Sequence, residues 1–123
     1  MKFTQQSPAG AHLIRRYGAD LIVIGEEEIR RSCLVSAATL MRDWPPRNVE
    51  DLAIAHLAPI FELAPEVVVL STGATQKFPR AALRAEFAMR RIGLEIMEVG
   101  AACRTYNVLV SEERRVLGAI LLP

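Results

Sequence analysis

The second half of the chain alternates between short apolar runs and segments in which apolar residues recur at helical spacing. The short runs predict strands, and the longer periodic segments predict helices. We expect a strand at Val67–Leu70, a helix from Pro79 to Ile92 that Gly93 stops, a strand at Leu94–Val99, a helix from Ala101 to Ser111 and a strand at Val116–Leu122. This order of elements predicts an α/β sheet with right-handed crossovers.

The first half of the chain shows a pattern of shorter strands. Leu21–Ile24 is a β-branched run between two glycines and predicts a strand. Every second residue from Ile29 to Val35 would share one face of an extended segment, which predicts an antiparallel partner for that strand. A third short strand is expected at Ala38–Met41. This half therefore predicts an antiparallel meander.

A proline-rich loop separates the two halves. Trp44–Arg47 contains two adjacent prolines, which can extend neither a helix nor a central strand. We expect Trp44 to plug the core or to anchor this loop. Asn48 fits the N-cap of a helix whose apolar positions run to Ile60, and Pro59 is expected to kink or end that helix.

The composition supports one folded domain. The chain has 123 residues, of which 51% are hydrophobic and 24% are charged. A chain of this length buries enough surface to fold without disulfide bonds. Residues 1–16 show no clear period and predict a flexible N-terminal arm, so we expect a single domain at 17–123. The apolar runs are too short to span a bilayer, which predicts no membrane insertion.

Charge and cysteine usage exclude several classes of function. A net charge of +1 provides no field that would attract nucleic acid. Two cysteines form neither a disulfide framework nor a four-ligand metal set, so we expect no metal and no cofactor. The polar start of the chain lacks the apolar core of a signal peptide. These features predict a soluble cytoplasmic protein.

Polar residues gather where two of the predicted strands end. If Val67–Leu70 and Leu94–Val99 are parallel, the loop Ser71–Phe78 and the helix from Ala101 to Ser111 meet at one edge of the sheet, where α/β proteins bind ligands. Helix N-termini there would favour an anion. The candidate cleft consists of Thr72, Gly73, Lys77, Arg80, Cys103, Arg104 and Asn107.

Each of these residues also has an ordinary structural interpretation. The loop lacks a complete phosphate-binding motif, which favours a plain strand-to-helix turn. Cys103 lies in a helix first turn that would favour a thiolate, but no histidine is placed to serve it, so we favour a packed thiol. Arg104 is a solvated surface arginine, a ligand clamp or a tie to a carboxylate, and we place the tie ahead of the clamp. Tyr106 is expected in the core with its hydroxyl hydrogen-bonded.

Several segments together resemble a known family. They are VVVLSTG at 67–73, IGLEIM at 92–97, AACRTYNVL at 101–109, ERRV at 113–116, GA at 118–119 and the front hairpin at 21–35. The pattern is similar to a family of small conserved proteins of unknown function. That family includes the mitochondrial NADH-ubiquinone oxidoreductase (complex I) assembly factor 3 and the adipogenesis-associated domain-containing protein.

The resemblance implies a fold and a role. The implied fold has three layers: a mixed sheet of about five strands, with helices on one face and a helix plus the N-terminal hairpin on the other. At least one strand of the sheet would be antiparallel. The resemblance also implies an assembly or adaptor role with a protein partner, such as a respiratory or membrane complex under assembly. It supplies no catalytic residues.

The sequence therefore leads to one main hypothesis and one alternative. The main hypothesis is a non-enzymatic binding or assembly module that uses the candidate cleft. The alternative is a small-molecule or anion-binding protein that uses the 71–78 loop and the 101–111 helix, and that acts through the Cys103 thiol if it is an enzyme. A nucleophile–base pair is not visible, which favours the first. The oligomeric state stays open.

Overall fold

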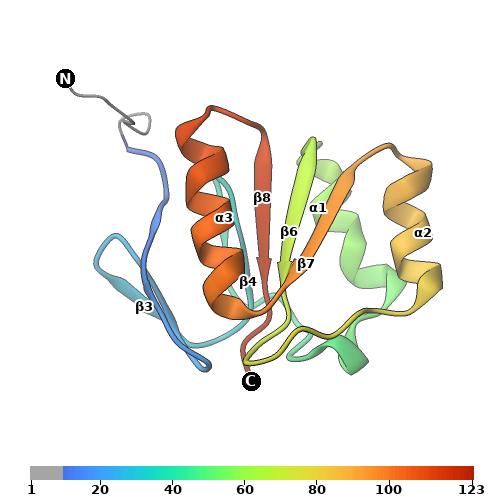
Figure 1. Ribbon diagram of the computed structural model, residues 1–123, viewed down its shortest axis with the longest axis horizontal. Helices are drawn as coiled ribbons and strands as arrows, with labels where there is room; N and C mark the ends of the chain where they lie inside the picture. The colour runs from blue at the N-terminus through green and yellow to red at the C-terminus, as the bar shows by residue number, and fades with distance from the viewer. Residues whose placement is uncertain (1–9) are drawn as a thin grey trace.

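The computed structural model describes residues 10–123 (Figure 1). Its elements are β1 Ile14–Tyr17, β2 Ile22–Ile24, β3 Glu27–Ile29, β4 Cys33–Val35, β5 Leu40–Met41, α1 Ala58–Glu62, β6 Val67–Ser71, α2 Ala81–Met89, β7 Gly93–Met97, α3 Val99–Ser111 and β8 Val116–Ile120. Strand β1 begins inside the segment 1–16 that the sequence predicts as an arm, and Ile14 is buried. Residues 1–9 of that segment lie outside the described residues.

A mixed five-stranded sheet organises the molecule. Its strand order is β5-β4-β8-β6-β7, with β6 parallel to both β7 and β8. Strand β4 runs antiparallel to β8, and β5 runs antiparallel to β4. All five residues of β6 are buried, as expected for a strand covered on both faces. The predicted α/β class and the mixed sheet are confirmed.

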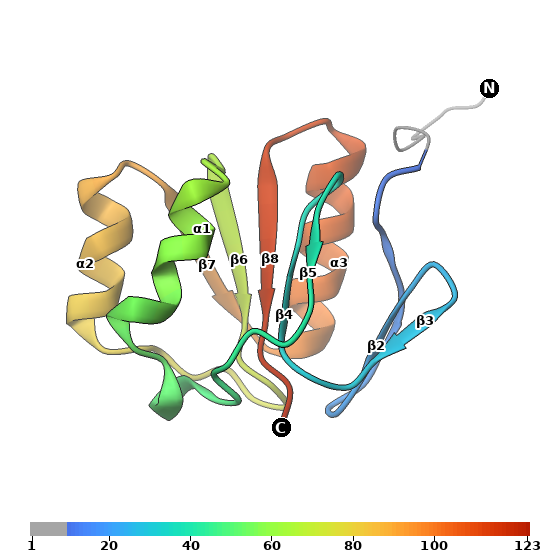
Figure 2. The ribbon, with the colours of Figure 1, turned by 180° about the vertical axis from the view of Figure 1, so that it is seen from behind.

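Helices and a small second sheet cover the two faces of the main sheet. Helix α3 and the three-stranded antiparallel sheet β1-β2-β3 lie on one side, and α1 and α2 lie on the other (Figure 2). Successive residues of β6 point to opposite faces of the sheet and join two hydrophobic cores. Val67 and Val69 pack toward α3, whereas Val68 and Leu70 pack toward α1 and α2. The three-layer arrangement is therefore confirmed.

The predicted strand from Ile29 to Val35 is in fact two strands in two sheets. The chain leaves β3 after Ile29 and enters β4 at Cys33. Strand β3 pairs with β2 as predicted, but β4 pairs with β8 of the main sheet. The reason is burial: every residue of β4 is buried, with Leu34 on one face and Val35 on the other. An alternating surface strand could not satisfy that pattern.

The segment after the proline-rich loop also differs from the single helix predicted there. Asn48 is an N-cap, since its Oδ1 accepts a hydrogen bond from the Asp51 N–H at 2.9 Å, but it caps only a short 3₁₀ turn at Val49–Asp51. A second 3₁₀ turn covers Ile54–Leu57. Pro59 lies in the first turn of α1 rather than at its end, because proline lacks only an N–H that is free there.

Helix α2 ends at Met89 without a glycine. Gly93 starts β7 instead of stopping the helix. The stop is Arg91, whose φ of 58° is left-handed. The Arg91 N–H bonds to the Ala88 carbonyl at 3.1 Å, and the Ile92 N–H bonds to the Phe87 carbonyl at 3.0 Å. This is the usual left-handed helix ending, made with a residue that has a Cβ.

Replacing Arg91 with glycine is expected to raise the free energy of unfolding by about 0.5–1 kcal/mol. A left-handed backbone is costly for arginine, and the entropy that glycine adds to the unfolded chain offsets only part of the gain. Chemical denaturation measures the change. Arg91→Ala is the matched control, because it removes the same side chain and keeps the strained backbone. Equal stabilities for the two variants would contradict the explanation.

Candidate functional site

The loop after β6 and the start of α3 lie together at one edge of the sheet, as the sequence predicted. Strands β6 and β7 are parallel neighbours, so their carboxyl ends lie together. The Thr72 N–H bonds to the Met97 carbonyl at 2.9 Å, and the Val99 N–H bonds to the Gly73 carbonyl at 2.8 Å. The loop after β6 therefore lies directly against the start of α3.

The hydroxyl of Thr72 serves the loop itself. It donates to the Thr75 carbonyl at 2.7 Å and accepts from the Lys77 N–H at 3.1 Å. Gly73 has a φ of 101°, a conformation that favours glycine. Thr72 and Gly73 thus shape the turn, while the residues Lys77 and Arg80 are exposed beyond it.

The N-terminus of α3 already holds an anion, the carboxylate of Glu98. Its two oxygens accept hydrogen bonds from the Gly100 N–H at 2.7 Å and the Ala101 N–H at 2.8 Å. These backbone bonds, together with the positive charge of Arg104, lower the pKa of Glu98 below its ordinary value. A negatively charged ligand would have to displace this carboxylate. The sequence did not reveal Glu98, because it falls at the end of a predicted strand.

The two thiols lie in the core on the α3 side of the sheet. Cys33 and Cys103 are both fully buried and free. Burial is the main cause that raises the pKa of each thiol to about 12, and for Cys103 the negative charge of Glu98 contributes to that rise. His56 accepts the Ala53 N–H through its Nδ1 at 3.0 Å, so this imidazole is part of a local turn. The packed-thiol interpretation of Cys103 fits these contacts.

The segment Arg104–Asn107 holds the N-terminal strand. Asn107 clamps Ile14 from both sides: its Oδ1 accepts from the Ile14 N–H and its Nδ2 donates to the Ile14 carbonyl, each at 2.9 Å. One residue earlier, the Tyr106 hydroxyl donates to the His12 carbonyl at 2.7 Å. The polar cluster that marks this helix is thus a docking device for β1.

Arg104 completes this docking device at the surface. Its Nη1 donates to the Tyr17 hydroxyl at 2.8 Å. The guanidinium lies over Gly100, where an added Cβ would meet Arg104 Nη1 at 3.1 Å and Tyr17 Cε1 at 3.3 Å. Arg104 thus has a structural contact, but its partner is a tyrosine hydroxyl and not the carboxylate that the sequence predicted.

By their contacts, the seven candidate residues divide into three groups. Thr72 and Gly73 build the loop, and Lys77 and Arg80 project from it. The other three, Cys103, Arg104 and Asn107, face the core or strand β1. Within residues 10–123, no group of three or more His, Cys, Asp or Glu side chains is placed to hold a metal ion.

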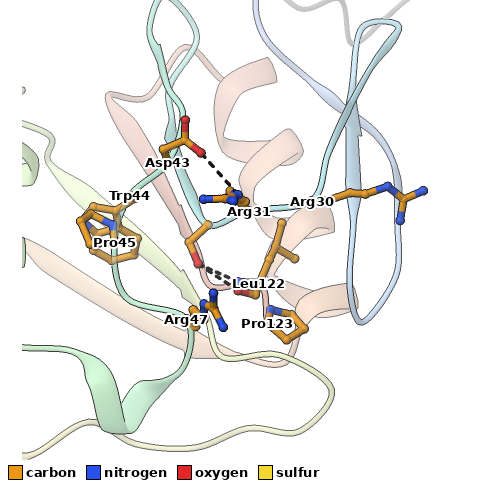
Figure 3. A pocket seen from close by; sticks show the side chains of 9 residues that line it. Arg30, Arg31, Asp43, Trp44, Pro45, Arg47, Leu122 and Pro123 are labelled. Atoms are coloured by element: carbon orange, nitrogen blue, oxygen red, sulfur yellow. Dashed lines mark hydrogen bonds and ion pairs between the residues drawn. The ribbon is translucent and has the colours of Figure 1, made fainter.

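A polar hollow of about 340 Å³ lies near the ends of β4 and β8. Figure 3 shows that the Arg30 side chain points away from it and that Arg31 points toward Asp43, 3.9 Å from Nε to Oδ1. The Ser32 hydroxyl already has a partner within the protein, since its Oγ accepts a hydrogen bond from the Leu122 N–H at 2.9 Å. The charged groups around this hollow therefore do not converge on one point.

A second, more apolar groove of about 340 Å³ runs between β7 and α2. It is lined by Phe78, Arg84, Phe87, Ala88, Ile92, Leu94 and Ile96. Phe78 is 63% exposed although its side chain is a large aromatic one. The sequence offered one signal for this groove, a lone aromatic residue at the end of a polar loop. The sequence analysis considered that loop only as a strand-to-helix turn or as part of the candidate cleft, and so missed the signal.

The fold and this surface define a class of protein: a single α/β domain with a three-layer mixed sheet and an exposed apolar groove. Residues 14–121 match the family described as protein of unknown function (DUF498/DUF598). The chain belongs to this family.

Its relatives have varied names. The NADH dehydrogenase [ubiquinone] 1 alpha subcomplex assembly factor 3 of Danio rerio is 27% identical over 121 residues, covering 97% of this chain and 69% of that protein. The 13 kDa major membrane protein of Francisella tularensis is 28% identical over 85 residues, covering 68% of this chain and 69% of that protein.

Solved structures show the same fold. An NMR structure of a Xanthomonas campestris protein is 34% identical, with a TM-score of 0.85, and the match covers 99% of this chain and 92% of that one. Within residues 10–123 of the present chain, no helix has the length and apolar character needed to cross a membrane.

Proposed function

We propose that this protein is a binding module that helps to assemble or hold a larger protein complex. The observation that carries the proposal is the exposed groove between β7 and α2, with the ring of Phe78 standing in solvent at its rim. Exposed apolar surface rimmed by polar residues is characteristic of a protein interaction site.

The composition of this surface supports a protein partner. Phe78 contributes an aromatic ring, and Arg84 lines the same groove. Lys77 and Arg80 flank Phe78 in the sequence and are both exposed. Aromatic and arginine side chains are enriched at the centres of protein interfaces, where a few of them contribute most of the binding free energy. We include two of the candidate residues predicted from the sequence, Lys77 and Arg80, in the proposed binding surface because they are exposed and lie within two residues of Phe78 in the sequence.

One of the reported relatives supports the same role by its name. The Danio rerio relative is named as an assembly factor of NADH dehydrogenase. We therefore propose as partner a subunit of a membrane-associated or respiratory complex during its assembly. The cytoplasmic location predicted from the sequence stays a prediction.

The alternative, an anion-binding or thiol-dependent protein, has less support. Glu98 occupies the N-terminus of α3, where an anion would have bound. The Cys103 thiol is buried, and its pKa of about 12 keeps it protonated at neutral pH. The protein-binding role therefore has the stronger physical basis.

The variant Phe78→Glu is expected to weaken partner binding at least about tenfold, because it places a charge where an apolar ring would be buried. The experiment purifies the tagged protein from its own cells under native conditions and identifies stoichiometric partners by mass spectrometry. The affinity of each purified partner is then measured for wild type and variant. Because Phe78 is 63% exposed, the variant should keep its melting temperature.

Val108→Glu is the matched control. Val108 is 51% exposed on α3, across the main sheet from the groove. This variant should bind the partner as the wild type does. The absence of any stoichiometric partner would contradict the proposed function. A partner that Phe78→Glu retains at full affinity would preserve the binding role and remove it from this groove.

A further inference from the structure

Strand β7 is an edge strand whose outer backbone groups are open. It pairs only with β6, on one side (Figure 1). The Gly93 N–H bonds to the Glu66 carbonyl at 3.0 Å, and the Met97 carbonyl accepts from Thr72 at 2.9 Å. Because backbone direction alternates along a strand, Leu94 and Ile96 direct their N–H and C=O groups away from β6.

One of these four outward groups has a partner in residues 10–123. The Gln76 side-chain amide donates to the Ile96 carbonyl at 2.8 Å. The carbonyl of Leu94 and the N–H groups of Leu94 and Ile96 have no such bond among the described residues. An edge of this kind is a template for an added strand.

The side chains of β7 differ on its two faces. Leu94 and Ile96 point toward α2 and form one wall of the groove that Phe78 borders. Glu95 points to the other face, is exposed, and has no ion pair within residues 10–123. An added strand would therefore meet a mainly apolar surface that also includes Arg84 on one face, and the negative charge of Glu95 on the other.

Glu95 opposes pairing with a second copy of the chain. A two-fold antiparallel pairing of the whole strand would place Leu94 opposite Ile96 of the other copy and Glu95 opposite Glu95. Side chains directly opposite in such a non-hydrogen-bonded pair are close, and like charges there are destabilising. A shift of the register by two residues avoids this contact only by pairing three residues of each strand, either Gly93–Glu95 or Glu95–Met97.

We infer that the β7 edge binds an extended segment of the partner protein in which one basic residue is flanked by two apolar residues. The inference rests on the proposed binding function. The basic side chain lies opposite Glu95, and its two neighbours enter the groove beside Leu94 and Ile96. The backbone of the segment bonds to the outward groups of Leu94 and Ile96 and displaces the amide of Gln76.

A designed peptide tests this pairing. The probe is an acetylated, amidated peptide Ser-Thr-Val-Lys-Val-Thr-Ser, and the matched peptide carries Glu in place of Lys. Both are titrated into the full-length protein while its backbone amides are followed by NMR. We expect the largest shifts at Leu94 and Ile96, and about threefold tighter binding of the Lys peptide, as expected for a cross-strand charge pair.

Reversing the charge on the protein should reverse the preference. The variant Glu95→Lys is expected to bind the Glu peptide about threefold more tightly than the Lys peptide. Since Glu95 is exposed, the variant should fold normally, which its melting temperature checks. Gln76→Ala should bind the Lys peptide at least as tightly as wild type, because it frees the Ile96 carbonyl.

Three outcomes would overturn the inference. They are no amide shifts at β7 at millimolar peptide, an unchanged preference in Glu95→Lys, and dimerisation of the wild type through β7 in sedimentation experiments. A measurement with the natural partner distinguishes failure of the strand-pairing site from failure of the proposed function. If the partner binds the wild type, and Glu95→Lys and Gln76→Ala bind it with the same affinity, the protein is a binding module but does not bind through the β7 edge.

Discussion

Replacing Asn107 with alanine is expected to lower the free energy of unfolding by about 2–4 kcal/mol. The substitution removes two hydrogen bonds of 2.9 Å, one to the N–H and one to the carbonyl of Ile14. Ile14 is only 3% exposed, so water cannot easily replace the lost partner. A buried backbone group left without a hydrogen bond costs more free energy than the bond itself contributes on average.

Two variants on the same helix make this prediction specific. Asn107→Asp keeps the oxygen acceptor but loses the amide donor, so its effect should be about half as large. Thr105→Ala is the control, since the Thr105 hydroxyl makes no hydrogen bond within residues 10–123. Chemical denaturation gives the free energies, and amide hydrogen exchange shows whether β1 is released first. Full stability in Asn107→Ala would show that β1 is held by other contacts.

Both native thiols are expected to react with iodoacetamide about a thousandfold more slowly than a free cysteine at about pH 8. The thiolate is the reacting form, and burial raises the pKa of each thiol from 9.0 to about 12. The thiolate fraction at that pH therefore falls by about three powers of ten. Denaturant should restore ordinary reactivity to Cys33 and Cys103 alike.

Mass spectrometry of the alkylated protein with and without denaturant measures both rates. Rapid labelling of Cys103 alone in the native protein would contradict the packed-thiol interpretation and would revive the thiol-dependent alternative.

The same pKa values set the direction of a pH dependence. Above about pH 9 the unfolded chain releases the protons of both thiols, whereas the folded protein retains them until about pH 12. The unfolded state then binds fewer protons, so the free energy of unfolding falls as the pH rises through this window. The variant Cys33→Ala should show a shallower fall than the wild type.

The sequence was most informative where local pattern and tertiary environment agree. The valines of β6 predict a strand buried on both faces, and β6 is the central parallel strand with all five residues buried. The parallel pairing of β6 with β7 followed from the intervening helix, because a crossover connection favours that arrangement. The common edge of the candidate site could be predicted for the same reason.

The errors arose where a local pattern was compatible with two environments. Alternation from Ile29 to Val35 fits one strand, yet the chain divides it between two sheets. The helix stop was assigned to Gly93, but Arg91 adopts the left-handed conformation because the following β7 must begin at Gly93 to pair with β6. Neither choice is visible without knowing which strands pair.

The cluster Arg104–Asn107 shows the same distinction in the candidate site. The sequence marked it as unusual for a core helix, which was correct, and suggested a ligand. Its partners are Tyr17, His12 and Ile14, more than 80 residues earlier in the chain. Spacing along one helix contains no information about a segment that far away.

By itself, the sequence determined the α/β class, the central buried strand and the family, because periodic burial and local motifs are properties of neighbouring residues. The tertiary structure alone decided that Asn107 holds β1, that Glu98 occupies the start of α3, and that Phe78 and Glu95 border an open strand edge. These features depend on contacts between segments that are distant in the sequence, and such contacts form only when the strands of the sheet are paired in their final order.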